Sequence, residues 1–148
     1  MKIIYGDPPI YADAVRRFGP LRPDVLFAWG DVIYTRQIRH EIDLGLVRHE
    51  ETHSKQQRKF GGPAAWWTRY LDDAEFRRDE EVEAYRAQLR FYIDKGLPRK
   101  VIRMAQLAIS KELSGPMYGR VMSRQDAMQA LTLPESSPKL VSFVRRRV

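Results

Sequence analysis

The sequence contains no cysteine among its 148 residues. A chain without cysteine forms no disulfide, has no thiolate nucleophile and offers no cysteine ligand to a metal. Any metal must therefore be bound by histidine, aspartate or glutamate. Histidine is itself scarce, with three residues in the chain, so a site that uses it leaves few choices.

Long apolar runs are absent as well. No stretch approaches the roughly 20 consecutive apolar residues of a membrane span. The first residues reach a pair of prolines at 8 and 9 and then charged side chains, so they lack the apolar core of a secretory signal. We therefore expect a cytoplasmic protein with no signal peptide and no membrane contact.

The composition is that of a folded chain. Hydrophobic residues make up 43% of the sequence and charged residues 30%, which is typical of a globular domain and excludes a wholly disordered one. The length predicts a single domain over residues 1–133. A polar stretch with two prolines begins at residue 134, and we expect 134–148 to be a basic tail or a terminal strand.

The chain is basic, with 26 Lys and Arg residues against 19 Asp and Glu residues and a net charge of +7. A basic chain of this kind makes nucleic acid a candidate partner. The basic residues are, however, scattered among acidic ones, and the one run of arginines is at 145–147. The pattern favours a solvated basic surface, with nucleic acid as an open alternative.

Two kinds of hydrophobic pattern divide the chain. The first forty residues are typical of strands: a short one at 3–5, and a hairpin of 25–29 and 32–35 around Gly30 and Asp31. From about residue 43 the apolar period becomes helical. The predicted helices cover about 43–60, 64–71, 76–95, 99–113 and 123–131. The fold class predicted is α+β, with a short N-terminal sheet followed by a mainly helical body.

The first long helix contains His49-Glu50-Glu51-Thr52-His53, an H-E-x-x-H motif. Residues four apart lie one turn apart on the same helix face, so both imidazoles can bind one zinc ion. Glu50 lies about 100° around the helix from His49, where it can reach a water on the metal without being a ligand. The motif predicts Zn²⁺ as cofactor and Glu50 as general base.

A catalytic zinc site needs a third protein ligand. Helical phase discriminates among three glutamates of the helix predicted at 76–95. Glu81 shares the more apolar face with Leu89 and Tyr92, and a carboxylate there needs a partner such as a metal. Glu83 lies on a face that is expected to be in solvent and is the second choice, while Glu80 is intermediate.

The two motifs together, HEETH at 49–53 and EVEAY at 81–85, resemble the zincin metallopeptidases of the gluzincin type, in which H-E-x-x-H is followed by E-x-x-A-D. The stretch 47–88 is similar to small metallopeptidase-like proteins of phages and bacteria. The resemblance implies a zincin-like fold, zinc binding by Glu81, and support of a ligand histidine from position 85. This sequence has Tyr85 there in place of Asp, a departure from the family pattern.

The resemblance also implies how a substrate would be bound. Zincins place an edge strand above the metal, against which an extended substrate pairs, and the 25–35 hairpin occupies that place in the chain order. A later Tyr or His often stabilises the oxyanion in these enzymes, and Tyr118 is the candidate here. Trp66, Trp67 and Tyr70 are expected to be packing residues, and His40 to be exposed.

The function expected from these residues is a zinc-dependent hydrolase that cleaves a peptide bond in a peptide or protein substrate. The alternative is of another class: a catalytically inactive binding protein on a zincin scaffold, such as a virion or nucleic-acid-associated component. The motifs leave the substrate, the oligomeric state and the biological process open.

Overall fold

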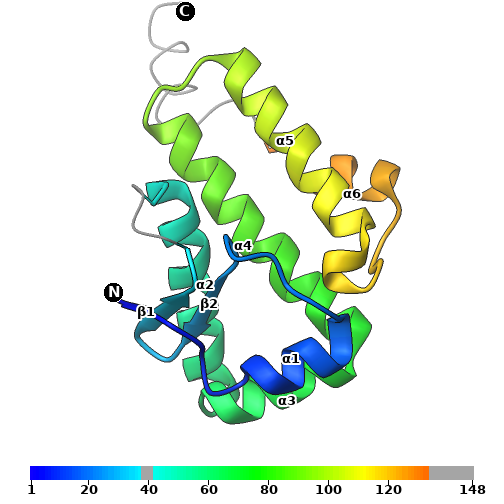
Figure 1. The fold of residues 1–148 in the computed structure, drawn as a ribbon. Helices are drawn as coiled ribbons and strands as arrows, with labels where there is room; N and C mark the ends of the chain where they lie inside the picture. Colours follow the sequence, from blue (N-terminus) through cyan, green and yellow to red (C-terminus); the bar gives the residue numbers. More distant parts are fainter. Residues whose placement is uncertain (38–41, 134–148) are drawn as a thin grey trace, which may run out of the picture.

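The computed structural model describes residues 1–37 and 42–133. This part of the chain contains a three-stranded sheet and six α-helices, and is mostly helical (Figure 1). The prediction of an α+β protein is therefore confirmed. The tail or strand predicted at 134–148 and the exposed position predicted for His40 both fall outside the described residues.

The sheet is built from the N-terminal segment and the predicted hairpin. Its strands are β1 (Lys2–Tyr5), β2 (Leu26–Trp29) and β3 (Val32–Thr35), in the order β1-β3-β2. β2 and β3 are antiparallel, β1 and β3 parallel. Gly30, in the two-residue turn, has a φ of +58°, which glycine adopts without strain. The hairpin is confirmed, and β2 is an edge strand.

The structure corrects the prediction at the N-terminus, where a helix interrupts the strand-forming region. Helix α1 (Tyr11–Phe18) follows the proline pair. Tyr11, Ala14 and Phe18 recur at helical spacing, and all three contribute to the core beside β2. Eight residues give only two turns, so the apolar period was too short to separate a helix from the neighbouring strands.

The helices predicted after residue 43 are all present. They are α2 (Leu44–Phe60), α3 (Pro63–Asp72), α4 (Ala74–Asp94), α5 (Arg99–Ser114) and α6 (Arg124–Ala130), with a single 3-10 turn, η1 (Pro116–Tyr118). Three of these helices, α2, α4 and α6, have N-cap side chains. Asp43, Asp73 and Ser123 accept hydrogen bonds from backbone N–H groups of the first turn. Gly61 ends α2 in the left-handed conformation.

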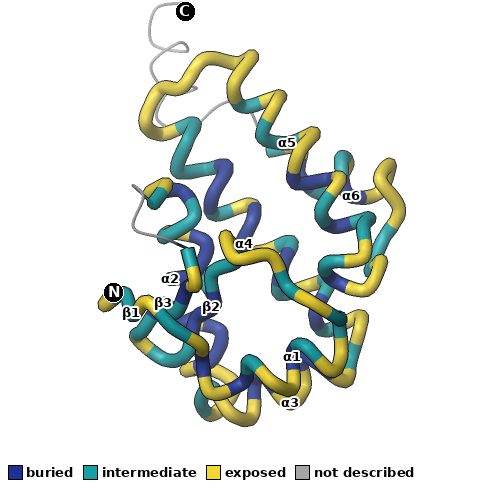
Figure 2. The backbone as a smooth tube through the Cα atoms, viewed as in Figure 1, coloured by how far each residue is buried: buried dark blue, intermediate teal, exposed yellow. Residues whose placement is uncertain are grey.

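Helices α2 and α4 pack against each other at the centre of the molecule, where buried positions are concentrated (Figure 2). Gly45 permits close contact at one end, since a Cβ atom there would lie 2.3 Å from the ring of Tyr92. The Tyr92 hydroxyl donates to Asp43 and so ties α4 to the start of α2. This hydrogen bond joins the two helices at that end.

Two hydrophobic clusters lie on either side of the α2–α4 pair. One joins α1, β2 and α3 around Trp66, and the other joins α4, α5, η1 and α6 around Leu89 and Leu113. Polar side chains between the two clusters are therefore removed from water. Among residues 1–37 and 42–133, no helix has the length and apolar character needed to cross a membrane.

Candidate metal centre

Helix α2 presents both histidines of the motif to the interior. His49 and His53 lie one turn apart, and their Nε2 atoms are 3.0 Å apart. Their residues are 4% and 5% exposed. The Tyr85 ring packs against His49 and the Trp66 ring against His53, with ring centroids 4.4 and 5.2 Å apart, so each imidazole is held by one of the two hydrophobic clusters.

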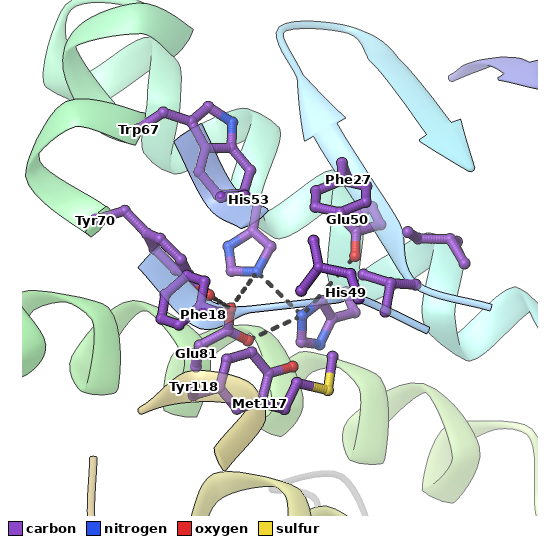
Figure 3. Close-up of a pocket in the computed structure, with 14 residues that line it drawn as sticks. Phe18, Phe27, His49, Glu50, His53, Trp67, Tyr70, Glu81, Met117 and Tyr118 are labelled. Atoms are coloured by element: carbon purple, nitrogen blue, oxygen red, sulfur yellow. Dashed lines mark hydrogen bonds and ion pairs between the residues drawn. The ribbon is translucent and has the colours of Figure 1, made fainter. Parts of the chain in front are cut away.

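Helix α4 brings Glu81 to the same point (Figure 3). One carboxylate oxygen, Oε2, lies 3.2 Å from His49 Nε2, and the other, Oε1, lies 3.4 Å from His53 Nε2. The Tyr70 hydroxyl donates a 2.6 Å hydrogen bond to Oε1. Helical phase therefore predicted correctly which glutamate faces the histidines, and Tyr70, expected only to pack, also orients this carboxylate.

The three side chains fit a metal ion. Ligand atoms about 2.0–2.1 Å from a tetrahedral ion are separated by about 3.3 Å. The two Nε2 atoms are 3.0 Å apart, and each of them lies 3.2 or 3.4 Å from a different oxygen of the Glu81 carboxylate. With one ligand atom taken from each residue, the three atoms lie within 4.8 Å of one another. Glu81 Oε2 is buried and has no hydrogen-bond donor among the described residues. The group of His49, His53 and Glu81 is thus buried, convergent and able to bind a metal.

Without a metal, a proton on the histidines stabilises the contacts of His49, His53 and Glu81. Burial alone would lower the pKa of His53, but the Glu81 carboxylate raises it to about 9. Burial opposes the ionisation of Glu81, yet His53 and His49 bring its pKa well below the usual range. Two Nε2 atoms at 3.0 Å require a proton between them, since two lone pairs would repel.

We expect the metal-free protein to lose stability as the pH rises from about 6.5 to about 9. His53 has a pKa above its unfolded value of 6.5, so its contribution is complete below pH 6.5 and is lost as the pH rises through about 9. The loss is on the order of 3 kcal/mol. Urea unfolding at a series of pH values measures it, and a free energy of unfolding that rises over this range would contradict the ion pair. His53→Gln should remove the slope.

Glu50 lies beside the three ligands without joining them. Its Oε1 is 4.0 Å from His49 Nε2, and the residue is 5% exposed. Burial raises the pKa of Glu50, while the nearby histidines and the backbone N–H of Ala28 act against the rise. A buried carboxylate with a raised pKa, adjacent to the ligand atoms, is suited to accept and return a proton.

The other two glutamates of the predicted set have different partners. Glu80 accepts a 2.7 Å hydrogen bond from Trp66 Nε1. Glu83 is exposed, as its helix face predicted, but it also accepts a 2.8 Å bond from Gln56 Nε2. Gln56 in turn lies 2.7 Å from His53 Nδ1. Gln56 was not among the predicted site residues, although its position three residues after His53 indicates that it lies on the same helix face.

The predicted support from Tyr85 differs in kind from the expectation. Its ring packs on His49, but its hydroxyl is 2.5 Å from the hydroxyl of Tyr118 and is hydrogen-bonded there, not to a ligand histidine. His49 Nδ1 has no hydrogen-bond partner among the described residues. Burial raises the pKa of Tyr85 and Tyr118 well above the usual value, so both hydroxyls stay protonated.

A cavity of about 50 Å³ borders the centre, lined by His49, Glu50, His53, Glu81 and apolar side chains. Figure 3 shows Phe18, Met117 and Tyr118 around it. Residues of α1, of the segment before β2 and of η1 therefore cover the ligands, and Tyr118 lines the same cavity as Glu50. The predicted site residues are thus gathered in one place.

No protein-family model matches the chain, and neither the curated proteins nor the solved structures contain a match. A function for this centre is therefore inferred from its side chains.

Proposed function

We propose that the protein is a zinc-dependent hydrolase that cleaves peptide bonds, with a zincin-like arrangement of its edge strand and two central helices. The observation that carries the proposal is the convergence of His49, His53 and Glu81, whose ligand atoms lie within 4.8 Å of one another, with Glu50 next to them. Two imidazoles and one carboxylate form a set that zinc enzymes use, and it leaves a fourth position for water or substrate.

The roles of the side chains follow from their positions. A zinc ion bound by the three ligands would polarise a substrate carbonyl and lower the pKa of a water molecule. Glu50 would accept the proton of the attacking water and pass it to the leaving nitrogen, because burial raises the pKa of its carboxyl group. The protonated hydroxyl of Tyr118, which lines the same cavity, would donate to the developing oxyanion.

A peptide substrate is supported by the edge strand. The carbonyl of Ala28 faces the edge of β2 opposite β3, but it already accepts hydrogen bonds from the side chains of Gln57 and Trp67. Leu26, two residues earlier, has its backbone on the same edge and lines the cavity. An extended peptide would therefore pair with β2 at Leu26, where it would pass beside Glu50.

The burial of the centre favours the alternative, a binding protein whose metal is structural. His49, Glu50, His53 and Glu81 are each 3–5% exposed, so a substrate must displace the covering segments before it can bind. A structural site needs no such opening. This observation makes activity, and not metal content alone, the decisive test.

The experiment is a metal analysis followed by an activity assay. Protein purified without chelator should contain close to one zinc ion per chain, and should cleave members of a random peptide library in a reaction that a zinc chelator stops and added zinc restores. A chain that contains no zinc and takes up none would refute the proposal. Bound zinc without cleavage would favour the structural role.

A further inference from the structure

The side chain of Gln56 connects the metal centre to the surface of α4. It is 6% exposed and lies one turn after His53 on α2. Its Oε1 is 2.7 Å from His53 Nδ1, while its Nε2 is 2.8 Å from Glu83 Oε2 and 3.1 Å from the Glu80 carbonyl oxygen. All three contacts have the length of good hydrogen bonds.

These contacts determine the orientation of the Gln56 side-chain amide, that is, which end carries the oxygen and which the NH₂ group. A carbonyl oxygen and an ionised carboxylate only accept hydrogen bonds, so Glu80 and Glu83 together require the NH₂ end of Gln56. The oxygen end of the amide then faces His53. Rotating the amide by 180° would place its oxygen against two acceptors and lose both bonds.

An amide oxygen opposite Nδ1 requires that Nδ1 carries the proton. In a neutral imidazole the lone pair is then on Nε2, the nitrogen that faces His49 and Glu81. We propose that Gln56 is a positioning residue that holds His53 in the tautomer able to bind zinc, and that Glu83 and the Glu80 carbonyl hold Gln56. This inference rests on the proposed zinc site.

The two histidines are supported unequally. His49 Nδ1 is buried and has no hydrogen-bond partner among the described residues, whereas His53 Nδ1 has Gln56. Hydrogen bonds to the second nitrogen of a metal-binding histidine orient the ring and raise its basicity. Gln56 thus fixes the proton on Nδ1 of His53 and leaves Nε2 free to bind zinc. Glu83 is not a ligand, and it affects zinc affinity only by holding Gln56 in place.

The first test is zinc affinity measured by competition with a chromophoric chelator. Gln56→Leu should weaken zinc binding about 10- to 100-fold, the range found for partners of metal-binding histidines. The double variant Gln56→Glu/Glu83→Gln exchanges the two groups: the new carboxylate accepts from Nδ1–H, and the new amide donates to it. Because the new carboxylate cannot donate to the Glu80 carbonyl, the double variant loses that one bond. It should bind zinc more tightly than Gln56→Leu and less tightly than the wild type.

Gln106→Leu is the matched control, because Gln106 also donates from its side-chain amide to a backbone carbonyl, that of Leu131, but lies on α5 away from the centre. It should leave zinc affinity unchanged. Failure of the double variant to recover affinity, with its helical content intact, would overturn the inference. Unchanged affinity in Gln56→Leu would do so as well.

The second test is spectroscopic and needs no activity. In protein loaded with cobalt(II), the N–H protons of the bound imidazoles give paramagnetically shifted NMR signals that disappear as they exchange with deuterium. The His53 signal should exchange slowly in the wild type and rapidly in Gln56→Leu, and slowly again in the double variant. Equal exchange in wild type and Gln56→Leu would overturn the inference. Wild-type protein that binds neither zinc nor cobalt would instead refute the proposed function.

Discussion

Glu81→Ala is expected to reduce zinc affinity about a hundred- to a thousand-fold. Zinc sites of four ligands bind with roughly 10–16 kcal/mol at neutral pH, so one ligand accounts for about 2.5–4 kcal/mol, and about 1.4 kcal/mol is tenfold in affinity. The remaining pair, His49 and His53, would hold the ion with solvent only. Zinc titration against a chelator of known affinity measures the loss. Glu81→Gln keeps the shape and the acceptor for Tyr70 and should lose zinc while remaining folded.

The same helix supplies the control. Glu75 is an exposed glutamate in the first turn of α4, and Glu75→Ala should leave zinc affinity unchanged. Glu83→Ala should lie between the two, because Glu83 reaches the centre only through Gln56. Normal zinc binding by Glu81→Ala, with loss in Glu83→Ala, would mean that the third ligand is assigned to the wrong glutamate.

Glu50→Gln should retain zinc and lose hydrolysis by a factor of about 10²–10⁴, the usual contribution of a general base. The amide has the same shape but takes no proton from water. The contact that motivates this prediction is the 4.0 Å separation between Glu50 Oε1 and His49 Nε2, which is too long for the spacing of ligands around one ion. Zinc content and peptide cleavage are measured on the same preparation.

Glu51→Gln is the matched control, one residue along the motif. Glu51 forms a partly exposed ion pair with Arg48, and its loss should change activity little, because such pairs contribute about 0–1 kcal/mol. Should zinc be lost from Glu50→Gln, Glu50 would be a ligand and its role as base would be wrong. Cleavage that survives in Glu50→Gln would likewise exclude it as base.

The parts of the fold that sequence predicted best are those with strong local signals. The hairpin around Gly30 has two strand-forming runs and a turn that needs positive φ, and the helix beginning after Asp43 has a cap at one end and Gly61 at the other. Helix α1 has no comparable local signal, because its eight residues give only two turns of apolar spacing. Its identity as a helix depends on packing against β2 and α3.

The candidate ligands were predictable because helical period is local. His49 and His53 share a face by spacing alone, and Glu81 was separated from Glu83 by about 200° of rotation along one helix. Partners from other elements were beyond such reasoning. Nothing in the spacing along the chain indicates that Tyr70 donates to Glu81 or that Gln56 bridges His53 and Glu83.

The sequence by itself determined which functional groups are available: two imidazoles and a carboxylate on one helix, no cysteine thiolate, and a second carboxylate on the apolar face of a later helix. Only the tertiary structure decided that these groups meet, because the crossing of α2 and α4 depends on contacts such as Gly45 with Tyr92, between residues 47 positions apart in the chain. It also decided their charge states. Burial and the neighbours of His53, Glu81 and Glu50 shift their pKa values, and both arise from packing across the whole molecule, not from the order of residues within one helix.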